Sequence, residues 1–299
     1  MHKNTTLYSN YLFVILAQIM GGINVVGAKY LINNVPLLFI LALRFALAAI
    51  ILLILHLLSR PEQTIVQSIK QLKPKPWAFI VAQALSAGVL FNVFMLWGLH
   101  YTKANVAGII TSALPAMVII LAWIFLKEQL TVKKWLCVGC ATAGLIIVNV
   151  KNLHGIAVER SLLGSLLVLI ALLPEACYYL LTKLYNIKMP VFLLSALINA
   201  INAAIVLPLM LAQMDWSTLN LSLTDIMVLL AISLGSGLFY VFWSLGIKKI
   251  SPAAASLSTA LMPIATVVIA ALFLQEQITL LQCLGMVFII VSIVICAKQ

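Results

Sequence analysis

Negatively charged residues are scarce in this sequence. Seven Asp and Glu stand against 18 Lys and Arg, and charged residues total only 8% of the chain. Soluble domains carry about 25% charged residues, so this composition excludes an ordinary soluble domain. Hydrophobic residues make up 64% of the chain, and the mean hydropathy is +1.18. The sequence therefore predicts an all-α membrane protein.

Clustered catalytic or metal-binding side chains are also lacking. The four histidines are scattered at helix ends or in loops, and the five cysteines fall in apolar runs. No grouping of Ser, His and Asp, or of His and Glu, falls inside an apolar run, as an active site would require. We expect no enzymatic activity, no metal and no cofactor. An intramembrane enzyme acting on lipids is a remote alternative. A passive pore is another, but the sequence shows no ring of charged residues or filter motif that would line one.

Ten apolar runs are long enough, at about 20 residues, to cross a hydrocarbon core of about 30 Å. They are approximately residues 11–31, 36–58, 77–98, 104–126, 133–150, 161–182, 190–212, 224–246, 252–274 and 279–297. With a cytoplasmic N-terminus, 13 Lys and Arg fall in inner segments and four in outer ones. This bias predicts that both termini are cytoplasmic. The formal charge of +11 then reflects membrane topology, and we expect no nucleic-acid partner.

One segment occurs twice, as residues 107–131 and again as 255–279, an offset of 148 positions. Nine of the 25 aligned positions are identical, including the prolines Pro115 and Pro263. We therefore divide the chain into two five-helix repeats, residues 1–150 and 151–299.

An odd number of helices per repeat inverts the second repeat in the membrane. Inverted repeats are typical of secondary transporters, whose substrate site lies near the bilayer midplane between the halves. Pro115 and Pro263 interrupt helices at matching depths, so we predict hinges there, with fixed packing kinks as the alternative.

Several motifs resemble those of the drug/metabolite transporter superfamily, in particular its EamA-like branch of ten-helix carriers. They are Gly22-Ile-Asn24-x-x-Gly-Ala-Lys29, Leu43-Arg44-Phe45-x-x-Ala48 and the two Pro-to-Glu-x-x-Thr segments ending at Thr131 and Thr279. The resemblance implies a cavity lined mainly by helices 1, 3, 4, 6, 8 and 9. It also implies transport of small metabolites, often amino acids or amphipathic compounds and frequently outward. The sequence departs from the family pattern at Glu175, where a tryptophan is common.

Glu175 and Arg44 are the ionisable side chains deepest within the apolar runs, where a charge costs at least about 2.5–3.5 kcal/mol. We predict that Glu175 binds a substrate amine or exchanges a proton, and that Arg44 binds a substrate carboxylate. Together they would suit a zwitterion such as an amino acid. For Arg44 a structural role, bonding helix 2 to neighbouring carbonyls, is an open alternative. A second alternative is a proton-coupled uptake carrier for a cationic or nucleoside-like metabolite such as S-adenosylmethionine.

Further polar side chains within the runs complete the predicted substrate-binding set, although a Ser or Thr could equally join helices. These residues are Asn24, Asn92, Thr111, Tyr178, Tyr240, Trp243 and Ser258. The expected partners are a small-molecule substrate and the lipid bilayer. We expect a monomer or weak homodimer in a bacterial inner membrane, acting by alternating access as an exporter or exchanger.

Overall fold

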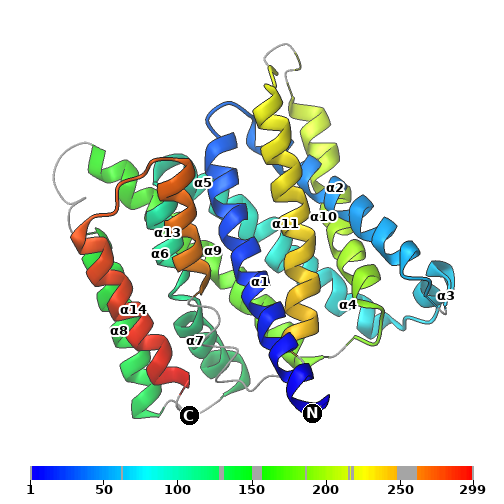
Figure 1. The fold of residues 1–299 in the computed structure, drawn as a ribbon, viewed down its shortest axis with the longest axis horizontal. Helices are drawn as coiled ribbons and strands as arrows, with labels where there is room; N and C mark the ends of the chain where they lie inside the picture. The colour runs from blue at the N-terminus through cyan, green and yellow to red at the C-terminus, as the bar shows by residue number, and fades with distance from the viewer. Residues whose placement is uncertain are drawn as a thin grey trace.

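The computed structural model describes residues 2–61, 63–127, 131–149, 157–185, 187–214, 216, 219–247 and 261–297, and within them it is a bundle of helices without strands (Figure 1). The helices are α1 (His2–Leu31), α2 (Leu37–Leu58), α3 (Ile65–Lys70), α4 (Pro74–Gln83), the π-helix η1 (Ala84–Leu90), α5 (Phe91–Tyr101), α6 (Ala104–Thr111), α7 (Leu114–Leu126), α8 (Val132–Asn149), α9 (Ala157–Leu184), α10 (Val191–Gln213), α11 (Leu223–Ile247), α13 (Leu261–Phe273) and α14 (Leu280–Ala297).

Six helical segments of the described chain are long and apolar enough to cross a membrane. They are Tyr11–Leu31, Leu37–Leu58, Pro74–Tyr101, Ser161–Thr182, Val191–Gln213 and Leu223–Gly246. The bent pair α6 and α7 would make a seventh. The all-α, multi-pass character is therefore confirmed. That α8, α13 and α14 also cross the membrane, giving ten spans, stays a prediction.

The helix expected over residues 104–126 is broken. α6 and α7 meet at an angle of 41°, and Pro115 stands in the first turn of α7. Proline lacks the N–H that would bond the carbonyl four residues back. Two hydroxyls bond carbonyls of α6 just before this break, since Thr111 donates to the Gly108 carbonyl at 2.6 Å and Ser112 donates to that of Ile109. Pro263 lies buried in the first turn of α13. Whether either proline is a hinge stays a prediction.

The third span contains a feature that the sequence did not predict. Between α4 and α5 the chain winds for seven residues as the π-helix η1. The Asn92 side chain donates to the carbonyls of Ala87 at 3.1 Å and Gly88 at 2.6 Å. These bonds tie the Asn92 side chain to the backbone of η1. Such π segments are frequent at functional sites.

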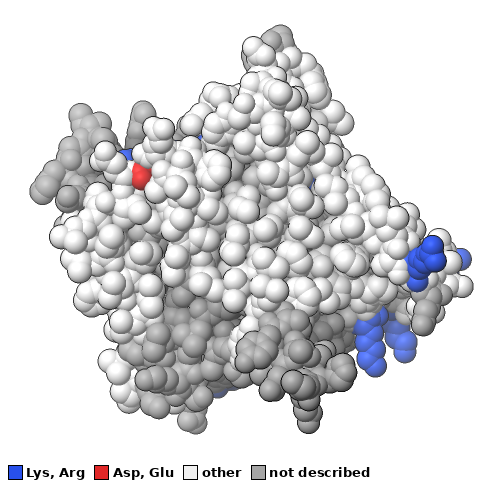
Figure 2. All heavy atoms as spheres, in the orientation of Figure 1, with Lys and Arg blue, Asp and Glu red and all other residues white. Residues whose placement is uncertain are grey.

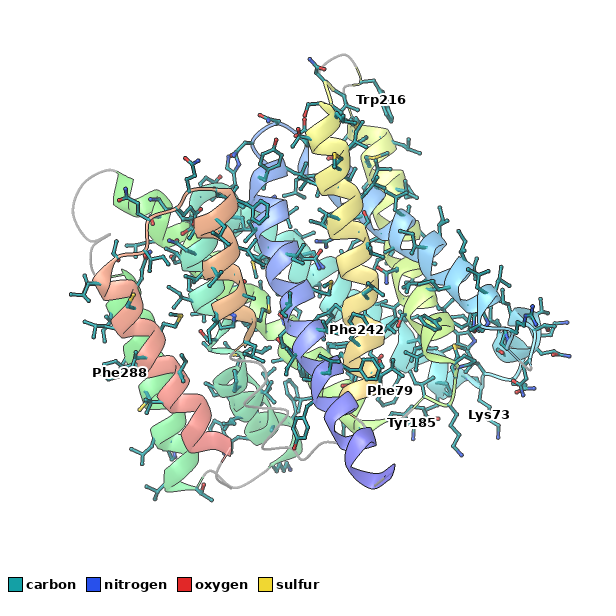
Figure 3. The ribbon with its side chains drawn as sticks, in the orientation of Figure 1. Lys73, Phe79, Tyr185, Trp216, Phe242 and Phe288 are labelled. Atoms are coloured by element: carbon teal, nitrogen blue, oxygen red, sulfur yellow. The ribbon has the colours of Figure 1, made fainter. Side chains whose placement is uncertain are left out.

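The two ends of the bundle differ in charge. α1 begins and α14 ends at the same end (Figure 1). In Figure 2 most of the visible Lys and Arg atoms lie at the lower right, over α3 and the start of α4, and Lys73 points outward there in Figure 3. Trp216 lies at the opposite end (Figure 3). We predict that the basic end faces the cytoplasm.

Small residues let α13 pack closely against α1 and α6. A Cβ at Gly22 would lie 3.0 Å from the Thr266 nitrogen, and one at Gly108 would lie 2.5 Å from the Thr266 Cγ2. No real Cβ tolerates the second distance, so this helix contact depends on glycine. Close backbone approach through small residues is the usual way helices associate in membranes.

We predict that Gly108→Ala destabilises the protein by about 1–3 kcal/mol, the usual cost of overpacking a filled core. Thermal unfolding of the detergent-purified protein measures the effect. Gly139→Ala in α8 is the matched control, because its added Cβ would meet nothing within 4 Å. Equal melting temperatures for the two variants would contradict the proposed dependence on Gly108.

Candidate functional site

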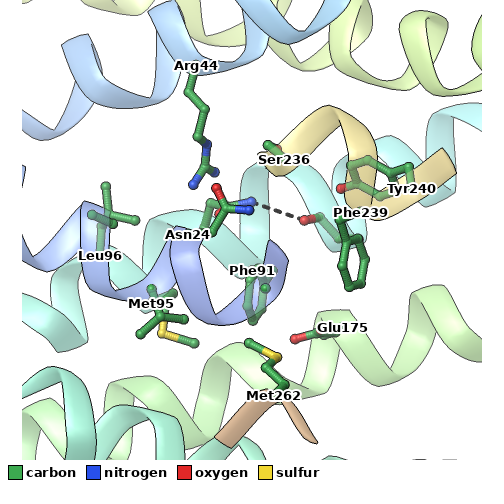
Figure 4. A pocket seen from close by; sticks show the side chains of 15 residues that line it. Asn24, Arg44, Phe91, Met95, Leu96, Glu175, Ser236, Phe239, Tyr240 and Met262 are labelled. Carbon is green, nitrogen blue, oxygen red and sulfur yellow. Dashed lines mark hydrogen bonds between the residues drawn. The ribbon is translucent and has the colours of Figure 1, made fainter. Parts of the chain in front are cut away.

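A cavity lies in the middle of the bundle, where α1, α2, the η1–α5 segment, α9, α11 and α13 meet (Figure 4). It is lined by Gly21, Asn24, Val25, Ala28, Arg44, Ala87, Phe91, Asn92, Met95, Leu96, Glu175, Ser236, Phe239, Tyr240 and Met262. When the ten predicted spans are numbered in chain order, the lining residues come from spans 1, 2, 3, 6, 8 and 9. Helix 2 thus replaces helix 4 of the expected lining, because Arg44 reaches in from α2 while Thr111 of α6 is buried elsewhere.

Both deeply placed ionisable groups reach this cavity, from opposite sides in Figure 4. Arg44 is 2% exposed and Glu175 is 5% exposed. Within the described residues, Nε and Nη2 of Arg44 and Oε2 of Glu175 have no hydrogen-bond partner. Leaving buried charged groups unpaired is costly. A guanidinium donor and a carboxylate acceptor are therefore available to a third, complementary molecule.

The two cavity amides differ in what they can offer. Asn24 donates through Nδ2 to the Met20 carbonyl at 3.0 Å, while its Oδ1 has no partner among the side chains and backbone described. Asn92 uses its Nδ2 on the backbone of η1, as described above. Asn24 thus keeps an unbonded acceptor in a residue that lines the cavity, whereas the Asn92 donor is bonded to the backbone of the π-helix.

Apolar side chains form much of the remaining wall. Phe91, Met95 and Leu96 come from α5, Phe239 comes from α11 and Met262 comes from α13. Sequence reasoning missed them because an apolar residue in an apolar helix carries no signal of which face it occupies. They give the cavity a face that would contact the hydrocarbon part of an amphipathic ligand.

Three of the predicted substrate-binding residues do not line this cavity. Thr111 is buried and bonds its own helix. Tyr178 and Trp243 belong instead to an aromatic cluster, in which Tyr178 contacts Tyr240 at 5.7 Å and Trp243 contacts Tyr179 at 4.7 Å between ring centroids. Aromatic rings pack favourably in such edge-on contacts. Through Tyr240 this cluster adjoins the cavity. Ser258 lies outside the described residues.

The cavity is small, with a volume of about 50 Å³. A water molecule needs at least about 10–15 Å³ by this measure, so the cavity has room for only a few waters. Ligand pockets usually measure about 300–1,000 Å³. This conformation is therefore closed around a polar centre, and a metabolite could enter only if surrounding helices move apart.

The chain is similar in sequence to bacterial transporters and in fold to a solved structure. The uncharacterized transporter YetK of Bacillus subtilis is 23% identical over 287 residues, covering 94% of this chain and 84% of YetK. The uncharacterized transporter YyaM of the same organism is 24% identical over 291 residues, covering 95% and 92%. A crystal structure of a protein only 14% identical superposes with a TM-score of 0.68 over 97% of this chain and 96% of that one, which shows a shared fold.

The sequence matches the model of the EamA-like transporter family in two consecutive segments, residues 9–150 and 162–297. Together these segments cover nearly the whole chain. The match agrees with the multi-pass helical bundle and with the motifs around Asn24 and Arg44. The chain belongs to the EamA-like transporter family.

Proposed function

We propose that this protein is a secondary transporter that moves a small zwitterionic metabolite, such as an amino acid, across the bacterial inner membrane by alternating access. The observation that carries the proposal is that Arg44 and Glu175 line one central cavity and that Nε and Nη2 of Arg44 and Oε2 of Glu175 lack a partner among the described residues. A substrate carboxylate would bind the guanidinium and a substrate amine would bind the carboxylate. Each buried group then gains a charged partner that the described residues do not supply.

Alternating access requires two related halves, and helix packing supports such a pair. In the predicted register α1 corresponds to α9, α2 to α10, the α4–η1–α5 span to α11, and α6–α7 to α13. Three contacts of the first half match three of the second. The contact of α1 with α11 matches that of α9 with α5, and the contact of α1 with α13 matches that of α9 with α7. The contact of α2 with α11 matches that of α10 with η1. Every one of these contacts has its counterpart when the halves are exchanged.

Backbone conformation adds independent support for the repeat. Lys127 has a φ of 53° and Gln275 a φ of 52°, a left-handed conformation that is uncommon outside glycine. The two residues are 148 positions apart, which is the offset of the sequence repeat. Both follow the corresponding helices α7 and α13. Residues 1–150 and 151–299 are thus proposed as inverted halves, with Arg44 in the first and Glu175 in the second.

Because the two charges come from different halves, a bound zwitterion would join the halves across the cavity. Binding energy would then favour a closed, occupied state, as an exchanger requires. The proposed direction is export or exchange, and the proposed oligomeric state is a monomer or weak homodimer. Proton-coupled uptake of a cationic metabolite is the second candidate, because Glu175 could hold a proton when the substrate is absent.

The direct test is counterflow. Proteoliposomes loaded with one unlabelled amino acid are diluted into buffer with a trace of the same labelled compound, for a panel of amino acids. We expect transient accumulation of label for at least one amino acid, since a carrier exchanges substrate across its cavity. A passive pore would give simple equilibration. Absence of counterflow for the whole panel would contradict the zwitterion proposal, and accumulation of a polyamine or nucleoside would favour the second candidate.

We predict that Glu175→Gln weakens binding of the active amino acid by about 10- to 100-fold, since a charged hydrogen bond contributes about 1.5–3 kcal/mol. Competition in the counterflow assay measures the change. An N-acetylated analogue, which lacks the positive amine, should bind wild type and variant equally. An unchanged affinity for the amino acid, with an unchanged pH profile of transport, would remove Glu175 from the mechanism.

Arg44→Gln should show the reciprocal pattern. The variant should lose affinity for the amino acid by a similar factor but keep its weak affinity for the decarboxylated amine. Asp225→Asn is the matched control, because Asp225 is a buried carboxylate whose Oδ2 accepts from the Ser222 nitrogen at 2.9 Å, away from the cavity. It should lower stability without changing the ranking of the ligands. Loss of both ligands in Arg44→Gln would indicate a structural role for Arg44.

A further inference from the structure

The carboxylate of Glu276 binds the start of another helix. Its Oε1 accepts from the Ala104 nitrogen at 3.0 Å and its Oε2 from the Asn105 nitrogen at 2.8 Å. These are the first two residues of α6. The Asn105 side chain donates in return to the Gln277 carbonyl at 3.2 Å. A carboxylate at a helix N-terminus is stabilised by the exposed N–H groups and by the helix dipole.

This contact joins the two halves of the chain. Glu276 lies in the loop after α13, in residues 151–299, and both of its backbone donors lie in residues 1–150. Lys29 of α1 adds a favourable Coulombic interaction with Glu276, and its Nζ donates to the Leu99 carbonyl at 2.6 Å. One carboxylate of the second half is therefore bonded by α6 of the first half and lies in the favourable field of Lys29 of α1.

The local backbone fixes where the carboxylate points. After α13 ends, the nitrogens of Leu274 and Glu276 both donate to the Ala270 carbonyl, at 2.9 and 3.3 Å. The left-handed conformation of Gln275 turns the chain between them. Glu276 is consequently presented by a tight turn at the end of α13. Its position follows that of the helix.

We propose that Glu276 is a latch that keeps the transporter closed at the end of the bundle opposite the termini, and that it must release α6 for that end to open. The inference rests on the proposed alternating access. The cavity is too small for a metabolite in this conformation, so α13 and the first half must separate at one end. Separation at the α6 end breaks all three hydrogen bonds at once.

The test measures opening directly and needs no substrate. Ala28 lines the cavity and is 1% exposed, so a cysteine there reacts with a membrane-impermeant maleimide only when the protein opens. In a cysteine-free background, Ala28→Cys is combined with Glu276→Ala or Glu276→Gln. Labelling rates are measured in spheroplasts, which expose the outer face, and in inside-out vesicles. Gln277→Ala is the matched control, because Gln277 contributes its backbone carbonyl to Asn105.

We expect Glu276→Ala to raise the labelling rate from the outer face by about 2- to 30-fold, the equivalent of losing a helix cap. Glu276→Gln, which keeps one acceptor and the side-chain volume, should give a smaller increase. Gln277→Ala should label like the parent. Size-exclusion profiles and melting temperatures identify any variant that fails to fold, and the Gln variant then carries the test.

Unchanged labelling from both faces in a folded Glu276 variant would overturn the latch. An equal increase in Gln277→Ala would overturn it too, because the loop and not the carboxylate would then be responsible. An increase confined to inside-out vesicles would support the latch and contradict the predicted orientation. Increased labelling together with absent counterflow would support the latch and contradict the proposed substrate, so the two proposals fail separately.

Discussion

The cost of removing charge from water governs this structure. A helix bundle in lipid must satisfy its polar groups internally, and with so few acidic residues each one has to be accounted for. Glu276 receives two backbone N–H donors and the field of Lys29. Asp225 accepts from the nitrogen and hydroxyl of Ser222. The other oxygen of Asp225, Oδ1, and the Oε2 of the cavity carboxylate Glu175 have no partner in the described part of the chain.

Glu175 differs from Asp225 in lining the cavity, where a ligand could reach its unbonded oxygen. A buried carboxylate that is bonded stabilises the fold, and its removal costs stability. A buried carboxylate left open costs free energy until something binds it. Arg44 carries the same cost on the other side of the cavity, since two of its nitrogens lack partners among the described groups. A zwitterion offsets both costs together, whereas a lone anion or cation would leave one charge unpaired.

The sequence predicted those parts of the site whose residue type is improbable in an apolar helix. Arg44, Glu175, Asn24, Asn92 and Tyr240 were chosen for that reason, and all five line the cavity. Helix ends marked by proline were also predictable, since Pro36 and Pro190 directly precede α2 and α10. The π-helix left no such signal. Its winding depends on tertiary contacts and on the Asn92 bonds, and it decides which residues of α5 face inward.

α13 connects the two features that the proposed cycle needs. Met262 at its start forms part of the cavity wall, and the Glu276 turn follows its end. Between them, Thr266 packs against the glycines Gly22 and Gly108, and Met262 itself lies against Gly21 of α1. A helix that packs on glycines of its neighbours and is bonded at one end by a carboxylate can move as a rigid body. Release of the Glu276 contact would then displace Met262 and widen the cavity in one motion.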